Sequence, residues 1–339
     1  MAQRATIEDR LGPEIERWSK FFRENTSTDE FWGQIKGSVG PGLERVQKAR
    51  QDKRDLLALL RFTSVRENLS ASAYLQGLPA EAHQPTGFEA EWKRMGGVLQ
   101  SALAKPSPNA LDGVEPLALR ALGETTLPRT RVYYDASVEY GRNTMPDSGL
   151  FYVGAARAQV EFAALARSLS VRSGLRAPAV RAIDGELRAL ESEMLAVYRP
   201  PLSIDKHPEF IGASAALKEA KELNAAGLRY GALLRYLQAA VRFAPLRPGV
   251  VDPESATIAE KLRSLRARLE ARGVDHSVGR MMLEVGEAEL ETPPAGFRNA
   301  AAIADDVLPR YFAALEPARP APAAVAARAR VTLVRWPYT

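Results

Sequence analysis

Hydrophobic residues recur at helical spacing along almost the whole chain, and the alternating pattern of a β-strand is nearly absent. The clearest stripe is formed by Val180, Ile183, Leu187, Leu190 and Met194, which follow one another in steps of three and four residues. This spacing places all five side chains on one helix face. The pattern predicts an all-α fold.

Capping and breaking residues refine this prediction. Thr86 and Glu89 have the spacing of a capping box at the start of a helix. A long helix is expected after Pro41, with its polar middle, Lys48–Arg54, facing solvent. Pro309 is expected to kink the last helix, because proline cannot continue the hydrogen-bond ladder.

The composition divides the chain into three regions. The segment Lys105–Gly113 is rich in turn-forming residues and predicts a loop, which separates an N-terminal helical region, residues 1–104, from a second helical region, residues 114–316. Residues 317–339 differ in kind, since a Pro/Ala-rich linker leads to the sequence RVTLVRWPYT. We expect a short extended tail there.

The tail is basic and aromatic. Four arginines and no acidic residue follow Glu316, and they account for most of the net charge of +5. Arg335, Trp336 and Tyr338 are therefore candidate contacts with a partner, either by strand addition or by filling a groove. The rest of the chain is nearly balanced in charge, which argues against a nucleic-acid partner.

Several classes of protein are excluded or disfavoured by composition. The chain has no cysteine, so disulfide frameworks and thiolate metal sites are absent. No apolar run approaches the roughly 18–20 residues of a membrane span. The N-terminus lacks the apolar core of a signal peptide, although Ala2-Gln3 would suit the residues left after signal removal, so cytoplasmic and periplasmic or secreted locations both stay open.

Candidate chemistry is sparse. The three histidines, His83, His207 and His276, are far apart and lie in or beside predicted loops, outside any metal-ligand frame on a helix. Asp305-Asp306 lacks the further acidic residue one turn on that a magnesium site would need. We expect no metal and no cofactor, and a function other than catalysis.

The segment Ala216–Pro245 reads as two short helices hinged at a glycine, with small residues where the helices touch and large residues between them. The residues that carry this pattern are Ala220, Leu223, Gly227, Ala232, Tyr236 and Ala239. The segment resembles a tetratricopeptide repeat, and Leu150–Gln159, with Gly154 at the close-contact position, is similar to the first helix of another. Glu219, Ala216 and Pro245 depart from the family pattern, and no 34-residue period is present. The resemblance therefore implies an irregular α-solenoid, a stack of helical hairpins.

Repeats of this family bind extended peptides along their first helices. Lys221 and Asn224 would then face inward, the lysine to pair with a carboxylate and the asparagine to hold a peptide backbone. Alternatively, both are ordinary solvated helix residues. The resulting hypothesis is a non-catalytic scaffold or adaptor that binds protein partners, or itself, through a helical groove and its C-terminal segment. The alternative is a helical small-ligand-binding protein or enzyme with a pocket near the Arg199–His207 loop.

Overall fold

A computed structural model describes residues 7–27, 30–143, 145–198, 206–247, 254–270, 273–293 and 295–315. These parts of the chain are helical almost throughout, and their β structure is limited to one isolated parallel bridge between Arg176 and Val274. The predicted all-α class is confirmed for the described residues.

Most helices in the first half of the chain are long. Its α-helices are α1 (Ile7–Glu24), α2 (Glu30–Gln51), α3 (Asp55–Gln76), α4 (Pro85–Val98), α5 (Gln100–Leu103), α6 (Leu117–Asn143) and α7 (Pro146–Leu169). The segment Lys105–Gly113 is a loop, as its turn-forming residues predict.

The second half has shorter helices. They are α8 (Asp184–Val197), α9 (His207–Ala225), α10 (Arg229–Phe243), α11 (Ser255–Leu269), α12 (Ser277–Glu289), α13 (Ala295–Ala302) and α14 (Leu308–Leu315). A π-helical turn, Ile303–Val307, joins α13 to α14 just before Pro309, which is where the kink is predicted.

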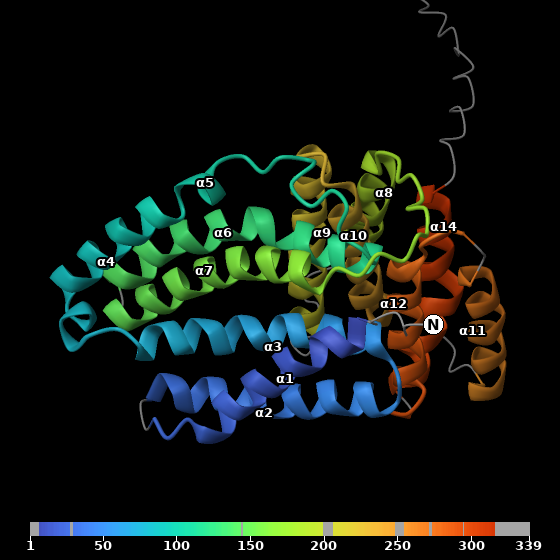
Figure 1. The fold of residues 1–339 in the computed structure, drawn as a ribbon. Helices are drawn as coiled ribbons and strands as arrows, with labels where there is room; N and C mark the ends of the chain where they lie inside the picture. Colours follow the sequence, from blue (N-terminus) through green and yellow to red (C-terminus); the bar gives the residue numbers. More distant parts are fainter. Residues whose placement is uncertain are drawn as a thin grey trace, which may run out of the picture.

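Helices α2, α3, α7 and α6 lie side by side in that order, and beyond them α10 packs against α6 and α9 packs against α10 (Figure 1). This is not the order of the chain, because α7 lies between α3 and α6, and α10 lies between α6 and α9. A solenoid stacks its hairpins in chain order. The predicted solenoid-like stack is therefore not confirmed.

Glycines allow the closest of these helix contacts. A Cβ at Gly149 of α7 would lie 2.5 Å from the Cα of Gly141 on α6, which is far inside van der Waals contact. A Cβ at Gly154 would lie 3.0 Å from the Cα of Ala71 on α3. Gly154, which the sequence marks as a close-contact position, thus lets α7 approach α3.

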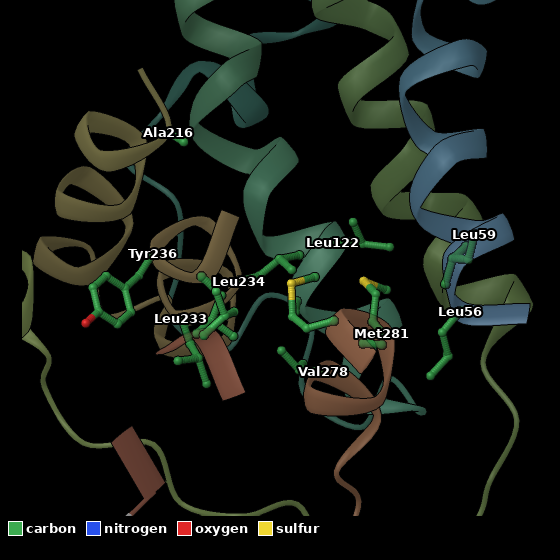
Figure 2. Packing of buried hydrophobic residues seen from close by; sticks show 14 of the residues in the cluster. Leu56, Leu59, Leu122, Ala216, Leu233, Leu234, Tyr236, Val278 and Met281 are labelled. Atoms are coloured by element: carbon green, nitrogen blue, oxygen red, sulfur yellow. The ribbon is translucent and has the colours of Figure 1, made fainter. Parts of the chain in front are cut away.

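One hydrophobic cluster extends from Leu11 to Ala314. Figure 2 shows how Leu122 of α6, Leu234 of α10 and Met281 of α12 meet at its centre, and all three are buried. The cluster thus draws on both predicted helical regions, and the boundary between residues 1–104 and 114–316 stays a prediction.

Three helices are capped by side chains that are remote in sequence. The backbone N–H of Leu57 in α3 donates to Glu284 at 2.8 Å, and that of Gly231 in α10 donates to Glu124 at 2.8 Å. The N–H of Leu117, the first residue of α6, donates to Asp275 at 2.6 Å. The three accepting residues, Glu284, Glu124 and Asp275, are all buried. Each carboxylate satisfies backbone donors that a helix leaves open at its N-terminus.

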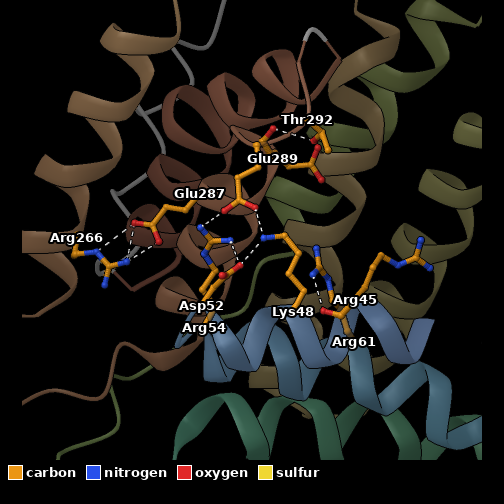
Figure 3. A network of polar contacts seen from close by, with 10 residues as sticks. Arg45, Lys48, Asp52, Arg54, Arg61, Arg266, Glu287, Glu289 and Thr292 are labelled. Atoms are coloured by element: carbon orange, nitrogen blue, oxygen red, sulfur yellow. Dashed lines mark hydrogen bonds and ion pairs between the residues drawn. The ribbon is translucent and has the colours of Figure 1, made fainter. Parts of the chain in front are cut away.

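The predicted long helix after Pro41 is wrong. Pro41 lies inside α2, and the polar segment Lys48–Arg54 contains the end of α2 and a turn, with Lys53 at a φ of 58°. Figure 3 shows Lys48 and Arg54 facing the end of α12, where Lys48 Nζ lies 2.8 Å and Arg54 Nη2 2.5 Å from Glu291. The polar stretch thus joins the α2–α3 turn to α12.

The predicted capping box at Thr86 and Glu89 is also wrong. Helix α4 begins at Pro85, so Thr86 lies inside its first turn and Gln84 takes the capping position without a side-chain hydrogen bond. Glu89 pairs instead with Arg142 of α6, with Nη2 donating to Oε2 at 2.9 Å. Proline at the first helical position is a stronger start signal here than the capping-box spacing.

Candidate partner-binding groove

Helices α9 and α10 form the predicted hairpin. Gly227 lies in the turn between them with a φ of +79°, a conformation that glycine adopts without steric cost. Ala220 of α9 and Ala232 of α10 are fully buried, and Tyr236 is almost so. The helix pair and its hinge are confirmed, whereas membership of the tetratricopeptide family stays a prediction.

Helix α8 lies against α9 through its apolar stripe. Ile183, just before the helix, and Leu187, Leu190 and Met194 within it are all buried, as their spacing predicts. Leu195 lies beside this stripe on the helix surface. The stripe fixes which face of α8 remains open to solvent.

Asn224 joins the start of α8 to the end of α9. Its amide nitrogen donates to Asp184 at 2.9 Å, and its side-chain oxygen accepts from the guanidinium of Arg229 and from the backbone N–H of Ile183 at 3.4 Å. The residue is only 5% exposed. Its hydrogen-bonding groups are therefore used within the chain.

The other end of α8 is held by ion pairs. Glu193 accepts from Arg247 at 2.9 Å and from Arg310 at 3.2 Å, and both arginines also pair with Asp306. Burial lowers the pKa of Arg310, but Tyr236 and Asp306 outweigh that effect, so its pKa is raised overall. Arg310 therefore stays charged, and its ion pair with Glu193 holds α8 against α14.

Between these two anchors, α8 and α9 enclose a groove of about 300 Å³. We call it the α8–α9 groove, and its lining residues are Glu191, Met194, Leu195, Phe210, Ser214, Leu217, Lys218 and Lys221. The walls are mainly apolar, and charged side chains form the rim, where the ammonium of Lys221 pairs with Glu191. Such a groove suits an apolar side chain flanked by polar groups.

Two large apolar side chains are exposed on these helices, Leu195, which lines the groove, and Ile211, which follows the lining residue Phe210 in the chain. Leu195 is 63% exposed, and Ile211 of α9, one helical turn before Ser214 on the same face, is 64% exposed. Each exceeds the exposure of every other large apolar side chain among the described residues. Phe210, which lines the groove, stacks with Tyr198 at a ring-centroid distance of 4.5 Å.

The residues predicted to bind a partner fall in different places. Lys221 lines the groove, whereas Asn224 is buried at the α8–α9 junction, and a binding role for either stays a prediction. Arg335, Trp336 and Tyr338 lie outside the described residues. Leu195 and Ile211 are not among the residues predicted from the sequence, although an apolar residue off the buried stripe of a helix is a signal that indicates such positions.

Other evidence on function is negative. Comparison with family models, with curated proteins and with solved structures gave no match. In the described segments, no three His, Asp or Glu side chains are grouped so that they could hold a metal ion. None of the helices in those segments is long and apolar enough to cross a membrane.

Proposed function

We propose that this protein is a non-catalytic interaction scaffold that holds an apolar segment of a partner polypeptide in the α8–α9 groove. The observation that carries the proposal is the exposure of Leu195 and Ile211 beside apolar walls formed by Met194, Phe210 and Leu217. Exposed apolar side chains around a hollow mark protein interaction sites more often than isolated ones do. The partner is another protein or a second copy of this chain.

The expected contribution of these side chains can be estimated. Complete burial of a leucine or isoleucine stabilises by about 1.5–3 kcal/mol. Since Leu195 and Ile211 are 63% and 64% exposed, a partner that covers them gains about 1–2 kcal/mol from each. Loss of one such contact weakens binding by about tenfold.

The proposal is tested by site-specific crosslinking followed by binding with purified components. A photoreactive amino acid at Ile211 should crosslink a partner in the source cells, and the same group at Val98, a 62% exposed valine on α4, serves as the control. The purified partner should then bind Leu195→Glu and Ile211→Glu at least tenfold more weakly than the wild type, and Val98→Glu equally well. A partner that binds all three variants with wild-type affinity would refute this use of the groove.

The C-terminal segment is a second docking element in this proposal. Residues 317–339 combine a Pro/Ala-rich sequence, typical of a linker, with Arg335, Trp336 and Tyr338. Truncation after Glu316 should leave helicity and melting temperature unchanged and remove one partner or self-association. The alternative of a ligand pocket near residues 199–207 stays a prediction, since residues 199–205 lie outside the described ones.

A further inference from the structure

A second hollow, of about 400 Å³, lies between α3, α6, α9 and α10. Helix α9 contributes Gly212, Ala216 and Glu219 to it, positions that share one face, whereas its groove residues Phe210 and Leu217 lie on another. We call this hollow the arginine pocket. It is separate from the α8–α9 groove.

Two of its arginines are already paired with carboxylates. Arg129 of α6 lies 3.2 Å from Glu67 of α3 and 4.0 Å from Glu219 of α9, and Arg235 of α10 lies 2.8 Å from Glu219. Tyr133 completes the group, because its hydroxyl donates to Glu67 at 2.5 Å. Two arginines and two glutamates thus form a balanced network that joins four helices.

A third arginine, Arg242 of α10, leaves the pocket with an excess positive charge. It forms no hydrogen bond and no ion pair with any described residue, and it lies at the mouth, exposed to solvent. Its Nη1 atom occupies the space that a side chain at position 212 would need, because a Cβ added to Gly212 would lie only 2.5 Å from it. The glycine therefore lets this guanidinium lie close against α9.

The charges of the other two arginines act on Arg235. Burial lowers the pKa of Arg235, and the positive charges of Arg129 and Arg242 lower it further, against the raising effect of Glu219 and Glu67. A neighbouring negative charge would relieve this unfavourable interaction. Guanidinium groups bind carboxylate and phosphate oxygens through paired hydrogen bonds.

We propose that the arginine pocket binds a small polar molecule through a carboxylate or phosphate group, with Arg242 as its main charged partner. The volume lies within the range of small-molecule sites. Ser64 and Asn68 of α3 also line the pocket, and their side chains form no hydrogen bond within the described chain, so they are available to the polar body of the ligand. This site goes beyond the scaffold function and does not depend on it.

Titration calorimetry with inorganic phosphate and with succinate tests the proposal, with sodium chloride at matched ionic strength as the reference. Saturable binding of phosphate alone assigns a phosphate group, and binding of succinate alone assigns a carboxylate. Arg242→Ala should weaken binding at least tenfold. Arg263→Ala should leave it within twofold, because Arg263 is an exposed arginine of α11 that does not line the pocket.

A second variant should strengthen binding. Glu219→Gln removes a negative charge from the pocket, so the affinity for the anion should rise several-fold, provided circular dichroism shows unchanged helicity. Absence of saturable binding of both anions to the wild-type chain would overturn the proposal. Wild-type affinity in Arg242→Ala would overturn it too.

Discussion

Glu284 is a buried carboxyl group at a helix terminus, and it should make the stability of the protein depend on pH. It lies on α12, is 5% exposed and accepts the backbone N–H of Leu57 at 2.8 Å. Burial raises its pKa from the ordinary 4.5 to about 7, and the hydrogen bond from Leu57 opposes this only in part. The native state therefore binds the proton more tightly than the unfolded chain does.

The sign and size of the effect follow from linkage. Because the native pKa is raised, the stabilising contribution of protonated Glu284 is complete below pH 4.5 and is lost as the pH rises toward about 7. This difference in pKa between the native and the unfolded chain lowers the free energy of unfolding by about 2.5 kcal/mol between about pH 5 and pH 8. For a chain of this length, that loss lowers the melting temperature by about 3–4 °C.

Glu284→Gln removes the titration but keeps an oxygen that can accept from Leu57. The variant should therefore lose the part of the pH dependence that is due to Glu284. Urea unfolding at pH 5, 6, 7 and 8, followed by circular dichroism, measures the free energy of unfolding of both proteins. The free energy of unfolding of the variant, minus that of the wild type, should rise by about 2.5 kcal/mol from pH 5 to pH 8.

Glu287→Gln is the matched control, one turn further along α12. Glu287 accepts from Arg266 at 2.6 Å near the surface, and pairs of this kind contribute about 0–1 kcal/mol. The control should keep the pH dependence of the wild type. If Glu284→Gln and the wild type showed the same pH dependence, the reasoning from burial would be refuted.

Three further substitutions and one control test the fold, the first two and the control by urea unfolding and the last by melting temperature. Asp275→Ala leaves the N–H of Leu117 without its cap and should cost about 1–2 kcal/mol, and a loss below 0.5 kcal/mol would contradict the role of this contact. Gly154→Ala should destabilise by about 1–3 kcal/mol through overpacking, whereas Gly185→Ala, with nothing within 4 Å of the added Cβ, should not. Ala232→Trp should prevent the α9–α10 helices from packing, and an unchanged melting temperature would show that this contact is assigned wrongly.

Local features of this fold could be predicted from the sequence. The stripe that ends at Met194, the hinge at Gly227 and the loop Lys105–Gly113 depend on residues within a few turns of one another, so periodicity and turn chemistry are sufficient. The polar segment Lys48–Arg54 does not identify its own structure, because a solvated helix and a polar turn have the same composition. Only the positive φ of Lys53 and the contact with Glu291 distinguish the two.

The order of the helices could not be predicted in this way. Close approach at Gly149 and Gly154 places α7 between α6 and α3, and neither glycine indicates its partner helix. The helix caps could not be predicted either, because Glu284 is 227 residues from Leu57 in the chain. These contacts depend on long-range packing, which periodicity within one segment does not contain.

The geometry of α9 explains how one helix serves two proposed sites. Positions 212 and 219, seven residues apart, lie on the face of α9 that lines the arginine pocket, whereas Phe210 and Leu217, also seven apart, lie on the face that lines the α8–α9 groove. The buried alanines, such as Ala220, bind this helix to α10 and leave both faces available. A charge change in the pocket and an apolar change in the groove therefore act on opposite sides of α9, and the anion and the partner should bind independently.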